Sequence, residues 1–201
     1  MGVDHYVKAF QLTDGSIINC YIYDTAGQER YNALTLSYYK NADAILLVYD
    51  IANKNSFAKI KNFYVEKIKD SCKKNIPILL LGNKTDLEDK RQVTKEEGIQ
   101  LAVEEHYEFK ESSCVQNSNV AGAFEALVER WNVLMHTDPE FRNSMLERKP
   151  QMEVKTPMGK NNDFSENQIT RTISRKSIFL DNNQTLKRKK NHCCKKSEKT
   201  E

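Results

Sequence analysis

A chain of 201 residues with a formal net charge of +3 is long enough for one compact domain and an extension. The charge is uneven, since residues 1–136 balance to −3 and residues 137–201 to +6. The second segment therefore suits an anionic surface or a solvated, disordered state. The longest apolar runs, residues 44–49 and 76–81, are too short to cross a bilayer, which argues against a membrane-spanning protein.

Cysteine usage indicates the compartment. Three of the five cysteines are scattered and two, Cys193 and Cys194, are adjacent. This pattern is not a disulfide framework, so a reducing cytoplasm is the expected location.

The first half of the chain predicts strands. Residues 5–12 alternate in polarity, stop at turn-forming residues 13–16 and continue as residues 17–23, which indicates a hairpin. Residues 44–50 and 76–83 are nearly continuous apolar runs, typical of strands covered on both faces.

Apolar residues at helical spacing follow these strands. One helix is expected after an N-cap at Ser56, and Thr94 and Glu97 form a capping box that begins a second helix. A short strand is expected at residues 107–112, before a closing helix. The apolar faces expected of the three helices are Phe57, Ile60, Tyr64 and Ile68; Ile99, Ala102, Val103 and the core-edge His106; and Val120, Phe124, Leu127, Val128, Trp131 and Met135. Alternating strands and helices predict an α/β domain with a largely parallel sheet.

The composition changes after about residue 136. Prolines, asparagines and lysines dominate, so we expect a domain over residues 1–136 and a flexible basic tail over residues 137–201. Ile173 and residues 178–180 form a small apolar island in this tail, which could dock a partner.

Asp24-Thr25-Ala26-Gly27-Gln28 follows the apolar run that ends at Tyr23. An Asp at the carboxyl end of a strand can hold Mg²⁺, directly or through water. A glycine lets its N–H approach a γ-phosphate closely, and a glutamine can orient the water that attacks it. The string therefore predicts a nucleotide γ-phosphate sensor.

Asn83-Lys84-Thr85-Asp86 follows a second apolar run. An Asp carboxylate can accept hydrogen bonds from the ring N–H and the exocyclic amine of guanine, a pair of donors that adenine does not present. The site therefore discriminates against adenine by leaving a buried acceptor unpaired. Lys84 can lie along the base and Asn83 can brace the loop.

Together the two motifs resemble those of Ras-superfamily small GTPases, most closely the Rab branch, over roughly residues 1–136. The further strings that carry the resemblance are Gly2-Val3-Asp4, Glu29-Arg30-Tyr31, Ser37-Tyr38-Tyr39, Leu46-Leu47-Val48-Tyr49-Asp50-Ile51 and Gly82-Asn83-Lys84-Thr85-Asp86-Leu87. The resemblance implies a P-loop NTPase-like, mostly parallel sheet with flanking helices, and the cofactors GTP or GDP with Mg²⁺. The roles that it implies are catalytic for Gln28, metal-binding for Asp24, and nucleotide-binding for Gly27, Asn83, Lys84, Asp86, Leu87, Ser113 and Cys114.

The last guanine-contacting loop departs from the family pattern. Residues 111–115 read Glu-Ser-Ser-Cys-Val, where the family usually has Ala-Lys at the last two positions. Ser113 and the backbone of Cys114 are expected to touch the base, and Val115 removes a basic side chain. Cys114 is either an exposed, oxidation-sensitive thiol or an inert buried one.

A larger departure is that no Gly-x-x-x-x-Gly-Lys-Ser/Thr loop occurs among the seven glycines. The resemblance places Met1 after the first strand, phosphate loop, first helix and first switch, so we expect a form truncated by roughly 30 to 40 residues, the size of one βα unit with a switch loop. A domain that evolved without the loop is the alternative. Without that strand, residues 17–23 and 44–50 are expected to lack a common neighbour and to expose sheet edges.

The basic run of residues 187–190 precedes Cys193 and Cys194, which resembles the doubly prenylated end of Rab proteins. Residues 195–201 follow the pair, however, so lipidation would need trimming or palmitoylation. A nuclear-import or other anion-binding role of the basic run stays open.

The resemblance implies a Rab-like, guanine-nucleotide-dependent switch in vesicle and membrane traffic, with effector, exchange and GTPase-activating proteins as partners. It would work in the cytoplasm or on the cytosolic face of endomembranes, reaching an anionic membrane through the basic tail. No nucleic acid partner is expected, because the basic run has no interleaved aromatics. A nucleotide-independent interaction protein, a pseudo-GTPase, is the alternative, and whether this chain hydrolyses GTP is left open.

Overall fold

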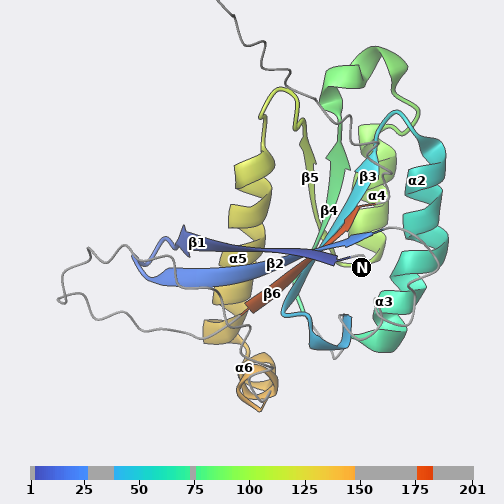
Figure 1. Cartoon of the computed structure of the whole chain (residues 1–201). Coiled ribbons are helices and arrows are strands. Elements are labelled where there is room, and N and C mark those ends of the chain that lie inside the picture. Colours follow the sequence, from blue (N-terminus) through green and yellow to red (C-terminus); the bar gives the residue numbers. More distant parts are fainter. Residues whose placement is uncertain (1–2, 27–38, 73–75, 148–175, 183–201) are drawn as a thin grey trace, which may run out of the picture.

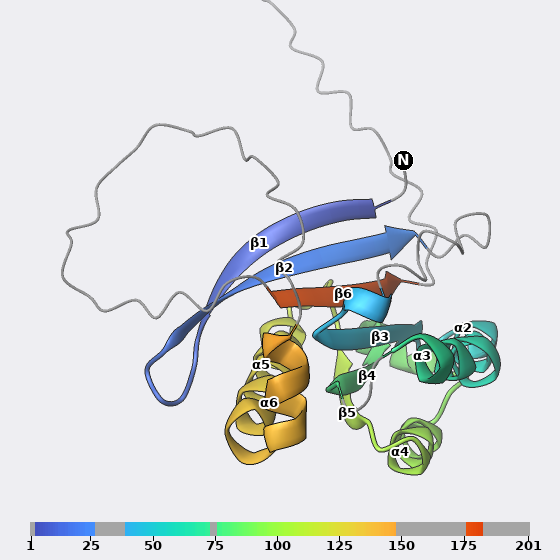
Figure 2. The ribbon, with the colours of Figure 1, turned by 90° about the horizontal axis from the view of Figure 1, so that it is seen from below.

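The computed structural model describes residues 3–26, 39–72, 76–147 and 176–182. These residues form a six-stranded sheet in the order β1-β2-β6-β3-β4-β5, in which only the β1–β2 pair is antiparallel. Helices α5 and α6 cover one face of the sheet and α2, α3 and α4 the other (Figures 1 and 2). The strands are β1 (Val3–Gln11), β2 (Ile17–Ala26), β3 (Ala44–Asp50), β4 (Ile78–Asn83), β5 (Glu108–Ser112) and β6 (Lys176–Asn182). The helices are α2 (Lys54–Lys59), the π-helical η2 (Ile60–Tyr64), α3 (Val65–Ser71), the 3-10 helix η3 (Thr85–Lys90), α4 (Lys95–Glu104), α5 (Val120–Thr137) and α6 (Pro139–Leu146). The predicted α/β fold with a largely parallel sheet is confirmed.

The predicted hairpin is β1 and β2. Their register runs from Val3 opposite Thr25 to Gln11 opposite Ile17. In the turn, Gly15 has a φ of +81°, and Asp14 Oδ1 accepts hydrogen bonds from the Ser16 N–H at 2.9 Å and the Ser16 hydroxyl at 2.6 Å. A glycine supplies the positive φ without a Cβ clash. Ser16 also lowers the pKa of the Asp14 carboxyl through these two bonds.

The core lies between the sheet and its helices. All seven residues of β3 are buried, as their continuous apolar pattern predicts for a strand covered on both faces. The closing helix α5 buries Ala123, Leu127, Val128 and Trp131, three of which belong to its predicted stripe of six. Two further members of that stripe, Phe124 and Met135, are partly buried and pack against the core. Burial of these side chains is the main force that holds α5 on the sheet.

The start of the helical segment that follows β3 was predicted wrongly. The N-cap of α2 is Asn53, whose side-chain Oδ1 accepts hydrogen bonds from the N–H groups of Asn55 and Ser56. Ser56 is buried inside the helix, and its hydroxyl lies 2.7 Å from the Asn53 carbonyl oxygen and 3.2 Å from that of Asp50. Asn and Ser are equally good caps, so composition alone did not choose between them.

The capping box of α4 is confirmed, but its buried face is not the one predicted. Thr94 and Glu97 exchange the two reciprocal bonds, at 2.8 and 3.1 Å. The helix buries Gly98, Leu101 and Ala102. Of the positions predicted to be buried, only Ala102 is; those that are exposed are Ile99, Val103 and His106. His106 follows the helix end with a φ of +59°, a position that caps a helix rather than edges a core.

Two of the described elements lie within residues 137–201. Helix α6 begins at Pro139 after the N-cap Asp138, and its Phe141 packs against Trp131 with ring centroids 6.2 Å apart. Strand β6 lies between β2 and β3. The expectation that β2 and β3 lack a common neighbour is therefore wrong, because a segment more than 120 residues beyond β3 fills the position. The boundary at residue 136 stays a prediction.

Candidate functional site

The carboxyl ends of the parallel strands bring the predicted guanine-binding residues together. Across β3, β4 and β5, the register pairs Asp50 with Asn83 and Asn83 with Ser112. All three residues are buried. In open α/β sheets, ligands bind outside the carboxyl ends of the strands, so these residues and the loops that follow them form the candidate site.

Asn83 connects three parts of this edge. Its side-chain Oδ1 accepts hydrogen bonds from the Lys84 N–H at 2.8 Å, the Ser112 hydroxyl at 3.3 Å and the Cys114 thiol at 3.6 Å. One amide oxygen therefore ties the loop after β4 to the loop after β5. Asn83 occupies the bracing position that the sequence predicted for it.

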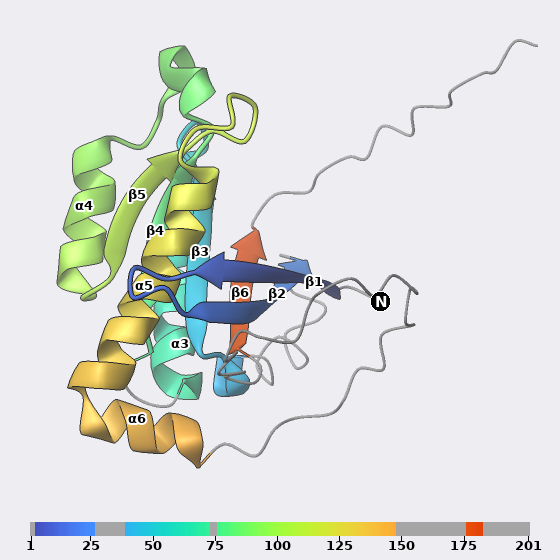
Figure 3. The same ribbon diagram turned by 90° about the vertical axis from the view of Figure 1, so that its left-hand side faces the viewer.

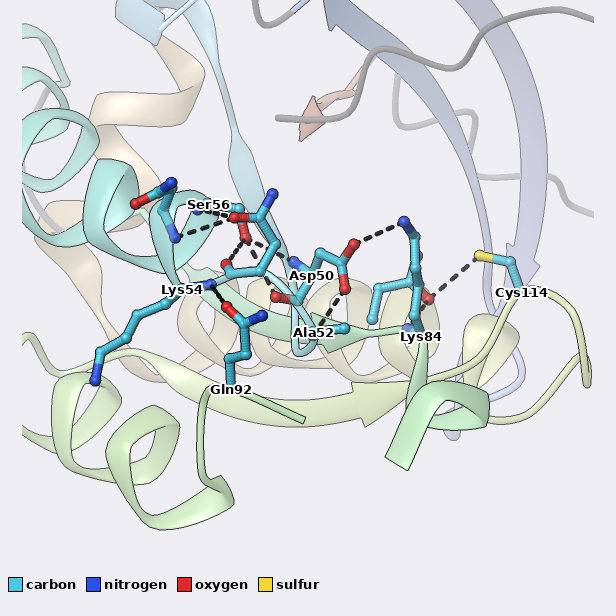
Figure 4. A network of polar contacts seen from close by, with 10 residues as sticks. Asp50, Ala52, Lys54, Ser56, Lys84, Gln92 and Cys114 are labelled. Carbon is cyan, nitrogen blue, oxygen red and sulfur yellow. Dashed lines mark hydrogen bonds and ion pairs between the residues drawn. The ribbon is translucent and has the colours of Figure 1, made fainter. Parts of the chain in front are cut away.

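Lys84 reaches back to the end of β3. Its backbone is left-handed, with a φ of +72°, and its Nζ lies 2.7 Å from Asp50 Oδ2 (Figure 4). The other carboxylate oxygen of Asp50 accepts the Ala52 N–H at 2.8 Å. The Asp50 N–H donates to the Ser56 hydroxyl at 3.0 Å. Lys84 is thus held by a charge-assisted hydrogen bond, and its partner Asp50 was not among the predicted site residues.

Asp86 and Ser113 face each other between the two loops. The Ser113 hydroxyl donates to Asp86 Oδ1 at 2.5 Å and accepts the Gln116 N–H at 3.1 Å. Ser113 is fully buried, and its backbone exchanges two hydrogen bonds with Ser118. A carboxylate has about four lone-pair positions, so Asp86 retains capacity for further donors after binding Ser113. Leu87 follows as a half-buried residue whose N–H donates to the Lys84 carbonyl at 2.8 Å.

An arginine that sequence reasoning missed joins the same two loops. Arg91 donates to Glu111 through Nη1 at 2.7 Å and Nη2 at 3.2 Å, and to Glu88 through Nε and Nη2 at 2.7 Å each. Its hydrogen bonds to Glu88 and then to Glu111 raise the pKa of the guanidinium above its usual value. Arg91 therefore fixes η3 against the end of β5. The i,i+3 spacing of Glu88 and Arg91 was a usable signal for one bond, but nothing local pointed to Glu111.

The next two residues of the Ser113 loop reach the molecular surface, although the Cys114 thiol still donates to Asn83 Oδ1. Cys114 is exposed, and Val115 is 82% exposed. The thiol therefore corresponds to the exposed alternative rather than the buried one.

Of the predicted phosphate-side residues, the structure describes Asp24 alone. Asp24 lies near the end of β2, half-buried, opposite Leu180 of β6 in register. Gly27, Gln28, Cys193 and Cys194 lie outside the described residues. Within the described residues, no group of three or more His, Cys, Asp or Glu side chains could hold a metal ion. A single carboxylate still fits Mg²⁺, which commonly binds one or two carboxylates together with phosphates and water.

No helix in the described part of the chain combines the length and the apolar character needed to cross a membrane.

The chain is similar in sequence to proteins of a known family. Residues 1–132 match the Ras family. The chain is 43% identical to the human Ras-related protein Rab-8B over 124 residues, which cover 62% of this chain and 59% of that protein. It is 42% identical to the bovine Ras-related protein Rab-8A over 127 residues, or 63% and 60% of the two chains. The chain thus spans about three fifths of the length of the curated relatives it matches.

Proposed function

The chain belongs to the Ras family, and from that premise we propose that it acts as a Rab-like small GTPase, a guanine-nucleotide-dependent switch in membrane traffic. The observation that carries the proposal is the joining of Asn83, Lys84, Asp86 and Ser113 at one edge of the sheet. The similarity to Rab-8 proteins supports the Rab branch.

Asp86 is the proposed guanine selector. Its carboxylate accepts the ring N–H and the exocyclic amine of the base, while Ser113 holds the carboxylate in place through Oδ1. Adenine offers no such pair of donors, so its binding would leave a partly desolvated carboxylate without partners. Asn83 holds the two loops at the spacing that this contact requires, and the stem of Lys84 lies beside the base.

The phosphate side rests on sequence and family alone. We propose that Asp24 binds Mg²⁺, that the Gly27 N–H contacts the γ-phosphate and that Gln28 orients the attacking water. Bound Mg²⁺ would neutralise charge on the phosphates.

The remaining proposals concern partners. Effector, exchange and GTPase-activating proteins are the expected ligands of such a switch. The net charge of +6 on residues 137–201 supports attraction to an anionic, cytosol-facing membrane surface. Cys193 and Cys194 are the proposed lipidation sites.

The test compares the two purine bases on the same protein. Saturation-transfer NMR of the full chain with GDP and with ADP should give a signal for the guanine protons at ligand concentrations where adenine gives none. Asp86→Ala should weaken GDP binding at least about tenfold, since a hydrogen bond to a charged group contributes about 1.5–3 kcal/mol.

Asp89→Ala is the matched control, because Asp89 is an exposed acid on the same 3-10 helix. The control should bind GDP like the unmodified chain. Equal binding of GDP and ADP, or equal losses in the two variants, would refute the assignment of Asp86.

A further inference from the structure

Lys84 is held at three points. Its backbone N–H donates to Asn83 Oδ1 at 2.8 Å, and its carbonyl accepts the Leu87 N–H at 2.8 Å. At the far end of the side chain, Nζ lies 2.7 Å from Asp50 Oδ2 (Figure 4). A lysine on a surface loop ordinarily samples many rotamers, so the contact with Asp50 determines the path of the stem between these points.

The partner of Lys84 comes from a neighbouring strand. Figure 3 shows β3, β4 and β5 side by side, and Asp50 ends β3 where Asn83 ends β4. The Ile51 N–H donates to the Asn83 carbonyl at 3.1 Å, which joins the two strand ends beyond their last register pair. The Asp50 carboxylate therefore lies beside the loop that carries Lys84 and Asp86.

Asp50 is itself fixed by bonds that do not involve the lysine. Its side chain is largely buried, and Oδ1 accepts the Ala52 N–H at 2.8 Å. Its own N–H donates to the Ser56 hydroxyl at 3.0 Å, and its carbonyl accepts the Asn53 N–H at 3.0 Å. None of these bonds uses Oδ2, so the loop after β3 orients the carboxylate and leaves Oδ2 for the ammonium.

Stability alone is a weak explanation for this pair. The Asp50 carboxylate is largely removed from water, and the Lys84 side chain is partly so. The desolvation of such a pair offsets much of its attraction, and well-packed apolar side chains often stabilise a protein equally well. A lysine that is ordered beside Asp86 has a use in binding, because a side chain fixed in advance does not lose its freedom when the ligand arrives.

We propose that Asp50 is a positioning residue for guanine binding, which holds the Lys84 ammonium so that the lysine stem is fixed beside the base position before the nucleotide binds. Asp50 does not touch the base and acts through Lys84. The inference rests on the proposed function, because it requires that Asp86 binds guanine. It adds a separate origin of affinity, the ordering of Lys84 in the ligand-free protein.

The test measures GDP affinity by saturation-transfer NMR titration of the full chain. Asp50→Asn retains the shape of the side chain and an oxygen for the Ala52 N–H, but it removes the charge that holds the ammonium. It should weaken GDP binding roughly two- to tenfold, the effect of one long side chain that must be ordered on binding.

Glu105→Gln is the matched control. Glu105 binds Lys69 of α3 at the same 2.7 Å, and its side chain is 16% exposed against 11% for Asp50. This pair joins α3 to the end of α4 and includes no residue of the candidate site. The control should bind GDP like the unmodified chain.

A double-variant cycle assigns the effect to Lys84. Lys84→Met keeps an unbranched stem and removes the ammonium. If Asp50 acts through the lysine, Asp50→Asn should cause no further loss of GDP affinity in the Lys84→Met background. Losses that multiply would show that the two residues act separately and would overturn the proposal. Unchanged binding in Asp50→Asn, or an equal loss in Glu105→Gln, would also overturn it.

A second measurement needs neither a ligand nor a variant of Asp50. Lysine ammonium protons are visible by NMR when a hydrogen bond slows their exchange with water. The unmodified chain should show such a resonance that Lys84→Met removes; Asp50→Asn should remove it as well, and Glu105→Gln should keep it. If the unmodified chain shows no Lys84 ammonium resonance, the proposal is wrong, even where Asp50→Asn does not fold.

The inference and the proposed function fail in different ways. If the unmodified chain binds GDP no better than ADP, the proposed function is wrong and the role of Asp50 falls with it. If the unmodified chain selects GDP and Asp50→Asn binds GDP equally well, only the role of Asp50 is wrong.

Discussion

Replacing Tyr49 with Phe should stabilise the domain. Tyr49 lies in β3, is 0% exposed and stacks at a tilt on Phe57 with ring centroids 4.9 Å apart. Among the described residues its hydroxyl has no hydrogen-bond partner. Burial also raises the pKa of this phenol above its usual value, because a buried site destabilises the charged phenolate even more than the neutral hydroxyl.

Two terms set the magnitude. A buried hydroxyl without a partner costs about 1–3 kcal/mol by protein mutational data. Removing one oxygen leaves a void of roughly 20 Å³, which costs about 0.5 kcal/mol. The expected net gain is about 1 kcal/mol in the free energy of unfolding, or roughly 2–4 °C in Tm for a domain of this size.

The assay is urea denaturation of the full chain, followed by tryptophan fluorescence of Trp131. Tyr6→Phe is the matched control, since Tyr6 is 57% exposed and its substitution should change stability by less than about 0.5 kcal/mol. If Tyr49→Phe loses about 1 kcal/mol or more, the hydroxyl has a partner, such as a buried water, and the reasoning fails.

Gly98 lies beside the Tyr49 hydroxyl and allows a second test. A Cβ at Gly98 would lie 2.6 Å from the Tyr49 hydroxyl and 2.5 Å from Phe109 Cε2. Gly98→Ala should therefore destabilise the domain by about 1 kcal/mol, because overpacking of about 1–3 kcal/mol exceeds the helix-propensity gain of about 1 kcal/mol. In the Tyr49→Phe background, the destabilisation caused by Gly98→Ala should be smaller by about 0.5 kcal/mol or more, because the new methyl group would occupy the space that the Tyr49 hydroxyl leaves.

Two further predictions concern ionisable groups. Burial raises the pKa values of Tyr49 and Tyr107, so both keep their protons at a pH where unfolded tyrosine, with a pKa of about 10, loses them. The free energy of unfolding should be constant below about pH 10 and fall above it, by up to about 1.4 kcal/mol per pH unit for Tyr49. Urea midpoints measured between about pH 8 and 11 should fall less steeply for Tyr49→Phe than for the unmodified chain. An equally steep fall in both proteins would contradict the assignment to Tyr49. Arg91→Met should cost about 3 kcal/mol, because it leaves the largely buried carboxylate of Glu111 unpaired. The double variant Arg91→Met/Glu111→Met should recover most of that loss in the same assay, and additive losses would rule out the ion pair as the cause.

Elements that are marked by a short sequence pattern were predicted correctly. Residues 44–50 read as a buried strand and are one, and the Thr94–Glu97 box begins α4 where expected. The buried face of α4 was not predictable in the same way. Helical spacing fits two alternative faces equally well: the observed one, positions 98, 101 and 102, and the predicted one, positions 99, 102 and 103. Gly98 lies against Phe109 and Tyr49 on the sheet, which is a tertiary contact that the spacing does not contain.

The candidate site shows the same division. The Asn83–Asp86 loop and Ser113 could be placed at one edge of the sheet from the sequence, the loop because it follows a buried strand and Ser113 because of the family resemblance; their guanine-binding role stays a prediction. Asp50 and Arg91 could not, since their partners Lys84 and Glu111 lie 34 and 20 residues away and meet them only in the folded sheet. The motif thus identifies the groups that would face the base, and the fold supplies the charges that hold them.

The position of strand β6 in the sheet is the feature that the sequence indicated least. The apolar run at residues 178–180 predicts a site for a partner, because nothing within it indicates which strand edges it pairs with. Its position in the sheet depends on two strands that end far earlier in the chain. A parallel strand also needs a long crossover, so its partners are never its neighbours in sequence. The structure therefore places the run within the sheet, and its interpretation as a site for a partner stays a prediction.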